Sequence, residues 1–113
     1  MRLDLQDEHL AVLRSCLRLH LPASARAFAF GSRVDGSARR YSDLDVALVW
    51  EHSLDLDTMA ALAEALSESD LPFKVDLLDA ALIDPAFRAR IAAGWVPLLE
   101  PSLTVMLPTA REA

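Results

Sequence analysis

Residues 44–50 read LDVALVW and form the strongest strand pattern in the chain. The run is short and apolar, and its valine and tryptophan residues favour a pleated, half-buried surface. We expect this strand at the centre of a β-sheet. Asp45 lies within the run and Asp43 immediately before it, so the predicted strand carries two carboxylates.

Strand and loop patterns continue on both sides of this run. Further strands are predicted at 26–30, 73–78 and 95–99. The last is expected at a sheet edge, because Pro97 cannot donate a hydrogen bond to a neighbouring strand. The segment 31–42 is rich in Gly, Ser and Arg, and we expect it to form a loop after the first of these strands.

Apolar residues recur at spacings of three and four in the segments between the strands. The sequence predicts helices over 7–21, 57–66 and 85–94, with Asp57 as the N-cap of the second. Pro85 suits the first turn of the third. Helices that alternate with strands predict an α/β (α+β) chain in which helices flank a small mixed sheet.

The length and composition fit a single domain with a short extension. The chain has 113 residues, of which 53% are hydrophobic, and this is enough for one ordinary core. We expect the domain to span residues 1–100. Residues 101–113 contain two prolines and no periodic pattern, and they are predicted to form a C-terminal tail. The tail includes Leu103 and the run 105–107, which suit contact with a partner.

Charge, cysteine content and hydropathy exclude several classes of protein. The formal net charge of −6 disfavours a general nucleic-acid binder, because neutralising phosphates requires clustered cations. Cys16 is the only cysteine, so no disulfide can form within the chain. No segment approaches the roughly 18 apolar residues of a membrane span. The sequence therefore predicts a cytoplasmic protein without a membrane anchor or a direct nucleic-acid partner.

Three carboxylates and one Gly-Ser pair have a spacing that suits metal-dependent chemistry. Residues two apart in a strand lie on one face about 6.5–7 Å apart, so Asp43 and Asp45 can converge on two metal ions. Asp76 lies inside a predicted strand, where a buried carboxylate needs a cation or hydrogen-bond donors. Gly31 permits close approach of the backbone to a ligand, and amides near Ser32, at the start of a short helix, can face phosphate oxygens.

This pattern resembles the minimal nucleotidyltransferases of the DNA polymerase β-like superfamily. Its parts are Gly-Ser at 31–32, ten intervening residues, Asp-x-Asp at 43–45 and a later strand aspartate, Asp76. The resemblance extends to Gly31-Ser32-Arg33, Gly36, Ala38-Arg39, Ser42-Asp43-Leu44-Asp45-Val46, Val75-Asp76-Leu77-Leu78 and the stretch 91–100. It covers roughly residues 8–100, and it implies the polymerase β-like fold with a two-metal phosphoryl-transfer site.

The resemblance also implies a role for each matching residue. Asp43 and Asp45 would bind both magnesium ions, and Asp76 would bind the ion that activates the acceptor hydroxyl. Ser32 would contact the triphosphate. The full set of nucleotide-binding candidates is Gly31, Ser32, Arg33, Arg39 and Ser42.

Small stand-alone members of this family act as antitoxins beside a HEPN-domain RNase toxin, and some transfer AMP from ATP to a toxin tyrosine. The resemblance therefore implies a HEPN toxin as partner, ATP as substrate and two Mg²⁺ ions as cofactor. Two positions depart from the family pattern. Asp35 stands where a basic residue is common, and Tyr41 where an acidic one is common, which leaves the nucleotide preference open.

Purely structural roles compete with these assignments. Asp43 and Asp45 could be solvated residues at the entrance to a strand. Asp76 could pair with Lys74 on the same face of an edge strand. A second Asp-x-Asp, at 55–57, has no Gly-Ser pair upstream and precedes a helical pattern, so we expect a helix cap there.

Three functions remain open from the sequence. The favoured one is a nucleotidyltransferase antitoxin that modifies its toxin, because the set of three carboxylates is complete. The second is a non-catalytic antitoxin that neutralises its partner by forming a complex. The third is an antibiotic-modifying nucleotidyltransferase, which is disfavoured because 113 residues leave little room for a domain that holds such a substrate.

Overall fold

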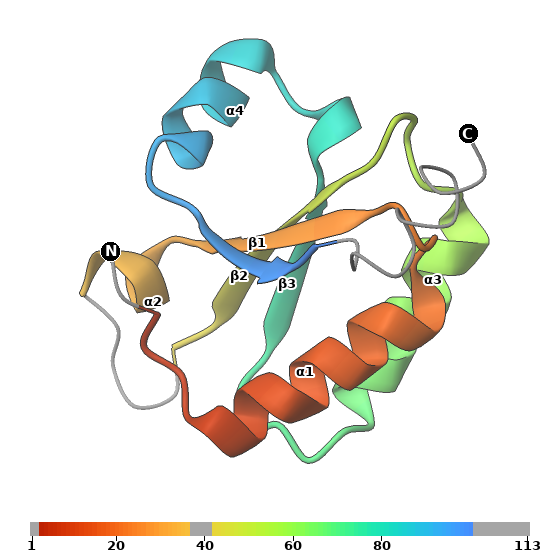
Figure 1. Ribbon diagram of the computed structural model, residues 1–113, viewed down its shortest axis with the longest axis vertical. Helices are drawn as coiled ribbons and strands as arrows, with labels where there is room; N and C mark the ends of the chain where they lie inside the picture. Colours follow the sequence, from red (N-terminus) through yellow and green to blue (C-terminus); the bar gives the residue numbers. More distant parts are fainter. Residues whose placement is uncertain (1–2, 37–41, 101–113) are drawn as a thin grey trace, which may run out of the picture.

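The computed structural model describes residues 3–36 and 42–100, in which strands and helices alternate along the chain (Figure 1). The helices are α1 (Asp7–His20), α2 (Ser32–Asp35), α3 (Leu56–Ser67), the 3₁₀ helix η1 (Ala80–Leu82) and α4 (Pro85–Ala92), and the strands are β1 (Arg26–Phe30), β2 (Leu44–Val49), β3 (Val75–Asp79) and β4 (Val96–Leu99). None of these described helices is long and apolar enough to cross a membrane. Arg39 and the predicted tail at 101–113 lie outside the described residues.

The strand β2 lies inside a four-stranded sheet whose order is β3-β2-β1-β4. It pairs in parallel with β3 and antiparallel with β1, and β1 also pairs antiparallel with β4. The interior position of β2 and the edge position of β4, which contains Pro97, are both as predicted. This mixed sheet with its helices confirms the predicted fold class.

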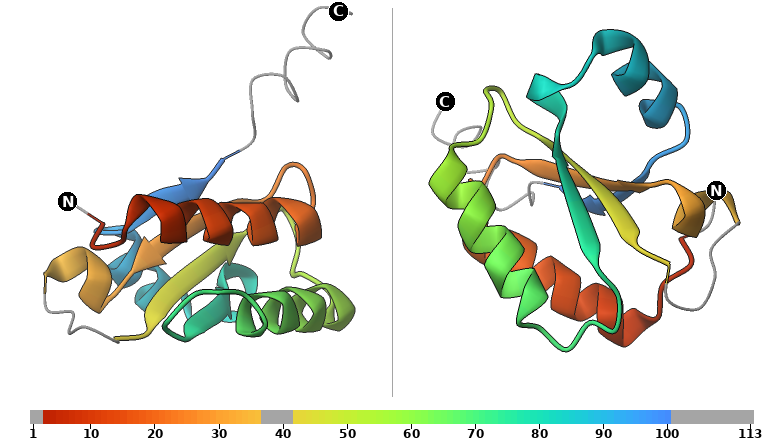
Figure 2. Two further views of the ribbon diagram at one scale, coloured as in Figure 1. Left: turned by 90° about the horizontal axis from the view of Figure 1, so that it is seen from below. Right: turned by 180° about the vertical axis from the view of Figure 1, so that it is seen from behind.

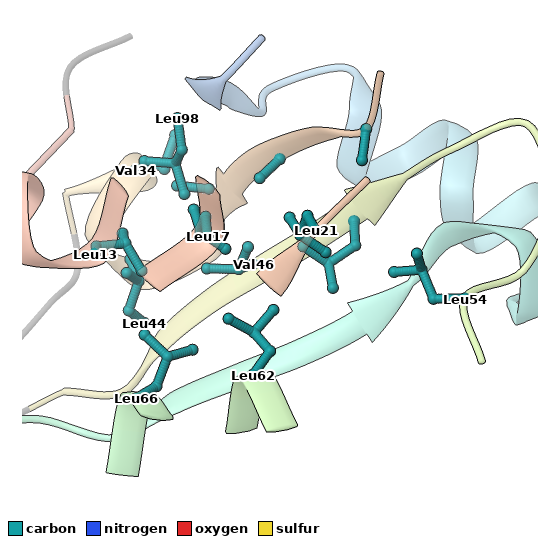
Figure 3. Close-up of a cluster of buried hydrophobic side chains, with 14 residues drawn as sticks. Leu13, Leu17, Leu21, Val34, Leu44, Val46, Leu54, Leu62, Leu66 and Leu98 are labelled. Carbon is teal, nitrogen blue, oxygen red and sulfur yellow. The ribbon is translucent and has the colours of Figure 1, made fainter. Parts of the chain in front are cut away.

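Helices α1 and α3 pack against each other over one face of the sheet, and Figure 2 shows them from two further directions. Alternate residues of β2, namely Leu44, Val46 and Leu48, face these helices. They form one buried cluster with helix residues that include Leu17 of α1 and Leu62 of α3 (Figure 3). This cluster fixes the register of β2, because a slip by one residue would turn its apolar side chains away from the helices.

The other face of the sheet carries aromatic and polar side chains. Phe28 of β1 stacks on Trp95, with ring centroids 4.3 Å apart and an interplanar angle of 10°. Helix α4 lies apart from α1 and α3 at one end of the sheet, and none of its residues is buried (Figure 1). Packing within the described chain therefore places little constraint on the surface of α4.

Helix α3 begins after Asp55, two residues before the predicted cap Asp57. The Asp55 carboxylate accepts a hydrogen bond of 2.7 Å from the Thr58 amide, as an N-cap residue does. Hydrogen bonds from the side chain and amide of Thr58 lower the pKa of the Asp55 carboxyl. Asp57 lies in the first helical turn, where a negative charge suits the helix dipole. The second Asp-x-Asp is thus a helix start, as expected, but its cap is the earlier residue.

Asp79 at the end of β3 is a buried carboxylate that is satisfied by two backbone amides. It is 7% exposed and accepts hydrogen bonds from the amides of Leu54 (2.7 Å) and Ala81 (3.0 Å). We predict that Asp79→Ala lowers the free energy of unfolding by about 1.5–3 kcal/mol, because hydrogen bonds to a charged group are lost. Urea unfolding measures this change.

The matched control for this prediction is Asp84→Ala. Asp84 caps α4 by accepting hydrogen bonds from two exposed amides, those of Ala86 and Phe87. Loss of an exposed cap costs about 1 kcal/mol, so this variant should be the more stable of the two. Equal urea midpoints for the two variants would show that burial of Asp79 adds nothing to its role as a cap.

Candidate functional site

The turn between β1 and α2 brings the backbone against a carboxylate of the neighbouring strand. Gly31 has φ +84° and ψ −151°, a region that is essentially restricted to glycine. A Cβ at this position would meet Asp45 Oδ2 well inside the closest approach of real Cβ atoms. The backbone conformation therefore favours glycine at this turn, and any side chain there would displace the Asp45 carboxylate.

The register of the sheet places two of the three predicted carboxylates side by side. Asp45 of β2 and Asp76 of β3 are partners in the parallel ladder. Leu44 and Val46 are buried beneath the helices, so strand alternation directs Asp45 to the opposite face of the sheet. Asp43 lies two residues before Asp45, at the entrance to β2, and is exposed.

The charges of the three carboxylates act on one another. The pKa of Asp45 is raised, first by burial and then by the negative charges of Asp76 and Asp43. The ionised form of Asp45 is therefore less favourable in the protein alone than in water. A cation bound between these carboxylates would remove that penalty.

The three aspartates offer the oxygen donors that Mg²⁺ prefers. As the side chains stand, residues 3–36 and 42–100 contain no group of three or more His, Cys, Asp or Glu side chains arranged to hold a metal ion. Asp76 Oδ1 lies 3.4 Å from Lys74 Nζ, in a largely exposed ion pair. The set fits magnesium by donor type, by strand register and by the repulsion felt at Asp45.

Arg33 and Ser42, two of the predicted nucleotide-binding residues, are joined by a hydrogen bond. Arg33 is 7% exposed, and its Nε donates to the Ser42 carbonyl oxygen at 3.0 Å. Its Nη1 donates to the Asp4 carbonyl oxygen at 3.1 Å, and its guanidinium carbon lies 4.3 Å from the centre of the Phe73 ring. Arg33 thus connects the N-terminal segment to the entrance of β2, and its contact with a nucleotide stays a prediction.

A hollow of about 230 Å³ adjoins the turn at Gly31. Asp35 of α2 lines it, together with Arg90 and Ile91 of α4. Ser32, which is predicted to contact the triphosphate, is the half-buried first residue of α2 at the same turn. No residue of α4 was predicted to belong to a site, because α4 is remote from the Gly-Ser turn along the chain and only the fold brings the two together.

Comparison with known proteins identifies the family of the chain. The profile of the family described as polymerase beta, nucleotidyltransferase matches residues 19–102. The chain is also similar to a Haemophilus influenzae protein named probable protein adenylyltransferase MntA, with 45% identity over 109 residues. That alignment covers 96% of this chain and 95% of the relative.

Solved structures show the same fold. A crystal structure of a toxin-antitoxin with AMP-PNP contains a chain that is 26% identical, with a TM-score of 0.69 over 87% of this chain and 78% of that one. A structure of tri-AMPylated Shewanella oneidensis HEPN toxin in complex with MNT antitoxin matches at 22% identity, with a TM-score of 0.64 over 91% of this chain and 79% of that one. From the family match and the close relative, this chain belongs to the polymerase beta nucleotidyltransferase family and is a nucleotidyltransferase.

Proposed function

We propose that this chain is a magnesium-dependent adenylyltransferase that acts as an antitoxin. It transfers AMP from ATP to a hydroxyl group, that of a tyrosine, in a cognate HEPN-domain RNase toxin, and the modification neutralises the toxin. The observation that carries the proposal is the pairing of Asp45 with Asp76 on adjacent strands, with Gly31 held against the Asp45 carboxylate.

The relatives support the individual parts of this proposal. The Haemophilus influenzae relative is named a protein adenylyltransferase, which supports a protein as acceptor. The toxin-antitoxin structure contains AMP-PNP, an analogue of ATP, which supports an adenine nucleotide as donor. The Shewanella oneidensis complex, similar in fold, pairs an MNT antitoxin with an AMPylated HEPN toxin, which supports the class of partner. A cytoplasmic location and the absence of a direct nucleic-acid partner stay predictions from composition.

The residues of the chain would divide the work as follows. Asp43 and Asp45 would hold both Mg²⁺ ions, and Asp76 would hold the ion that activates the acceptor hydroxyl. Ions held there would neutralise charge on the triphosphate and favour ionisation of the acceptor hydroxyl. The acceptor hydroxyl gives up its proton to water, and its oxygen bonds to the α-phosphorus of ATP as the bond from that phosphorus to the bridging oxygen breaks and pyrophosphate leaves. Gly31 keeps the space beside Asp45 open, and Ser32 contacts the triphosphate.

A labelling experiment tests this proposal. The purified chain and its HEPN toxin are incubated with Mg²⁺ and with ATP labelled on either the α- or the γ-phosphate. We expect label from α-labelled ATP on the toxin, none from γ-labelled ATP, and no transfer in the presence of EDTA. An increase in the intact mass of the toxin by whole AMP units would identify the product. Transfer of the γ-label would indicate a kinase reaction and overturn the proposal.

A second candidate function is neutralisation by binding alone. Its supporting observation is the ion pair between Asp76 and Lys74, which gives this carboxylate a structural partner within the chain. The variant Asp43→Ala separates the two functions when the RNase activity of the toxin is measured with each antitoxin. Equal inhibition by wild type and variant without any label transfer would establish the binding function, whereas loss of inhibition in the variant would support transfer.

A further inference from the structure

Arg90 of α4 lines the hollow of about 230 Å³ that adjoins Gly31. Because Gly31 also abuts the Asp45 carboxylate, this hollow lies next to the carboxylate site. We infer that Arg90 binds the triphosphate of the nucleotide. The inference rests on the proposed function, since it assigns a further residue to the same nucleotide site.

The size of the hollow and the guanidinium of Arg90 fit one part of a nucleotide. Pockets that enclose a whole ligand usually span about 300–1,000 Å³, so this smaller hollow suits a phosphate group or another fragment. The planar guanidinium of arginine presents several N–H donors that match the oxygens of a phosphate. Arg90 supplies the positive charge of the lining, and the carboxylate of Asp35 in the same lining offsets part of its attraction for an anion.

Two other cations near the site already have protein partners. Arg33 donates to the Ser42 carbonyl oxygen and lies over the ring of Phe73. Lys74 is paired with Asp76. Arg90 differs, because its guanidinium carbon lies 5.6 Å from the centre of the Phe87 ring on the exposed surface of α4. Such a contact uses the face of the guanidinium and leaves its N–H groups to a ligand.

A substitution at Arg90 tests binding more than folding. Arg90 is exposed, and α4 contains no buried residue. Arg88 provides a matched control, because it lies on the same helix, is also exposed and does not line the hollow. Replacing either residue by Gln removes one positive charge from the same helix.

The test measures binding of ATP to the full chain by calorimetry with Mg²⁺, in the absence of the toxin and at several KCl concentrations. We expect Arg90→Gln to weaken binding roughly tenfold, as loss of a charge-assisted contact does. Binding to this variant should also depend less on KCl, because one screened ion pair is gone. Arg88→Gln should keep the wild-type affinity and salt dependence.

Each other outcome counts against the inference. Unchanged affinity in Arg90→Gln, or equal losses in both variants, would overturn it and leave the proposed function in place, since the wild type would still bind ATP. Weaker binding with an unchanged salt dependence would indicate that Arg90 contacts an uncharged part of the nucleotide. This result would also overturn the inference. A wild-type chain that binds no nucleoside triphosphate would overturn both the inference and the proposed function.

Discussion

Asp45→Asn is expected to abolish nucleotide transfer and, at the same time, to make the metal-free protein more stable. Asp45 is the proposed ligand of both metal ions and the ladder partner of Asp76. Loss of its charge should reduce transfer roughly 100- to 1,000-fold or more, the range that follows removal of a group that stabilises transition-state charge. The two effects have opposite signs because the negative charge of Asp45 favours metal binding but, without metal ions, lowers the stability of the folded protein.

The gain in stability follows from the pKa of Asp45. Burial and the charges of Asp76 and Asp43 raise this pKa in the folded protein. The folded state therefore holds the proton more tightly than the unfolded chain does, and ionisation destabilises the fold. The penalty is absent below the pKa of the unfolded chain and complete above that of the folded protein, so it is present at neutral pH. Asparagine keeps the shape of the side chain and removes this penalty.

Thermal unfolding in EDTA, at neutral pH and in the acidic range where carboxyls protonate, measures this effect. The unfolding temperature of Asp45→Asn should exceed that of the wild type at neutral pH, and the difference should shrink as the pH falls. Mg²⁺ should stabilise the wild type and not the variant, because a ligand stabilises only the state that binds it. A variant that is less stable than the wild type at neutral pH without metal would contradict this prediction.

Asp57→Asn is the matched control for Asp45→Asn. It makes the same chemical change in the other Asp-x-Asp of the chain, at an exposed position in the first turn of α3. We expect wild-type transfer activity and no gain in stability, because the helix dipole favours the charge that is lost. Comparing the two variants therefore separates the effect of the environment of Asp45 from the general effect of removing one negative charge.

The position of β2 could be predicted from sequence because its apolar residues favour a strand locally and also form the buried face that packs against the helices. The predicted strand at 44–50 and the observed Leu44–Val49 agree to within one residue. The strand predicted at 73–78 begins at Val75 and ends at Asp79. Its end and the 3₁₀ helix that follows depend on hydrogen bonds that the amides of Leu54 and Ala81 donate to the Asp79 carboxylate. The first of these bonds joins segments that no local pattern connects.

The site was less accessible to sequence reasoning than the fold. The spacing of Asp43 and Asp45 could be interpreted directly, because strand alternation relates residues two apart. Their proximity to Asp76 depends on parallel pairing between β2 and β3, which spacing alone cannot give. Arg90 was missed for the same reason, because its place beside the turn at Gly31 arises from the fold and not from a motif.

Gly31→Ala is expected to lose both stability and transfer activity, and Gly36→Ala separates the causes. Both glycines have a positive φ, +84° at Gly31 and +86° at Gly36. A Cβ at Gly31 would collide with the Asp45 carboxylate, whereas a Cβ at Gly36 would meet nothing within 4 Å. Gly36→Ala should therefore show the backbone cost alone, about 1–2 kcal/mol for a left-handed residue with a Cβ.

Gly31→Ala should lower the free energy of unfolding in urea by more than Gly36→Ala does. The backbone conformation of Gly31 is restricted to glycine, and Asp45 must move to make room for the Cβ. Movement of Asp45 away from its place beside Asp76 should also remove most transfer activity, which Gly36→Ala should retain. The double variant Gly31→Ala with Asp45→Ala tests the contact itself, since the added methyl group would enter space that the carboxylate has left. It should be more stable than the sum of the two single effects predicts. Additive effects would mean that the backbone alone requires glycine there, and that the carboxylate does not.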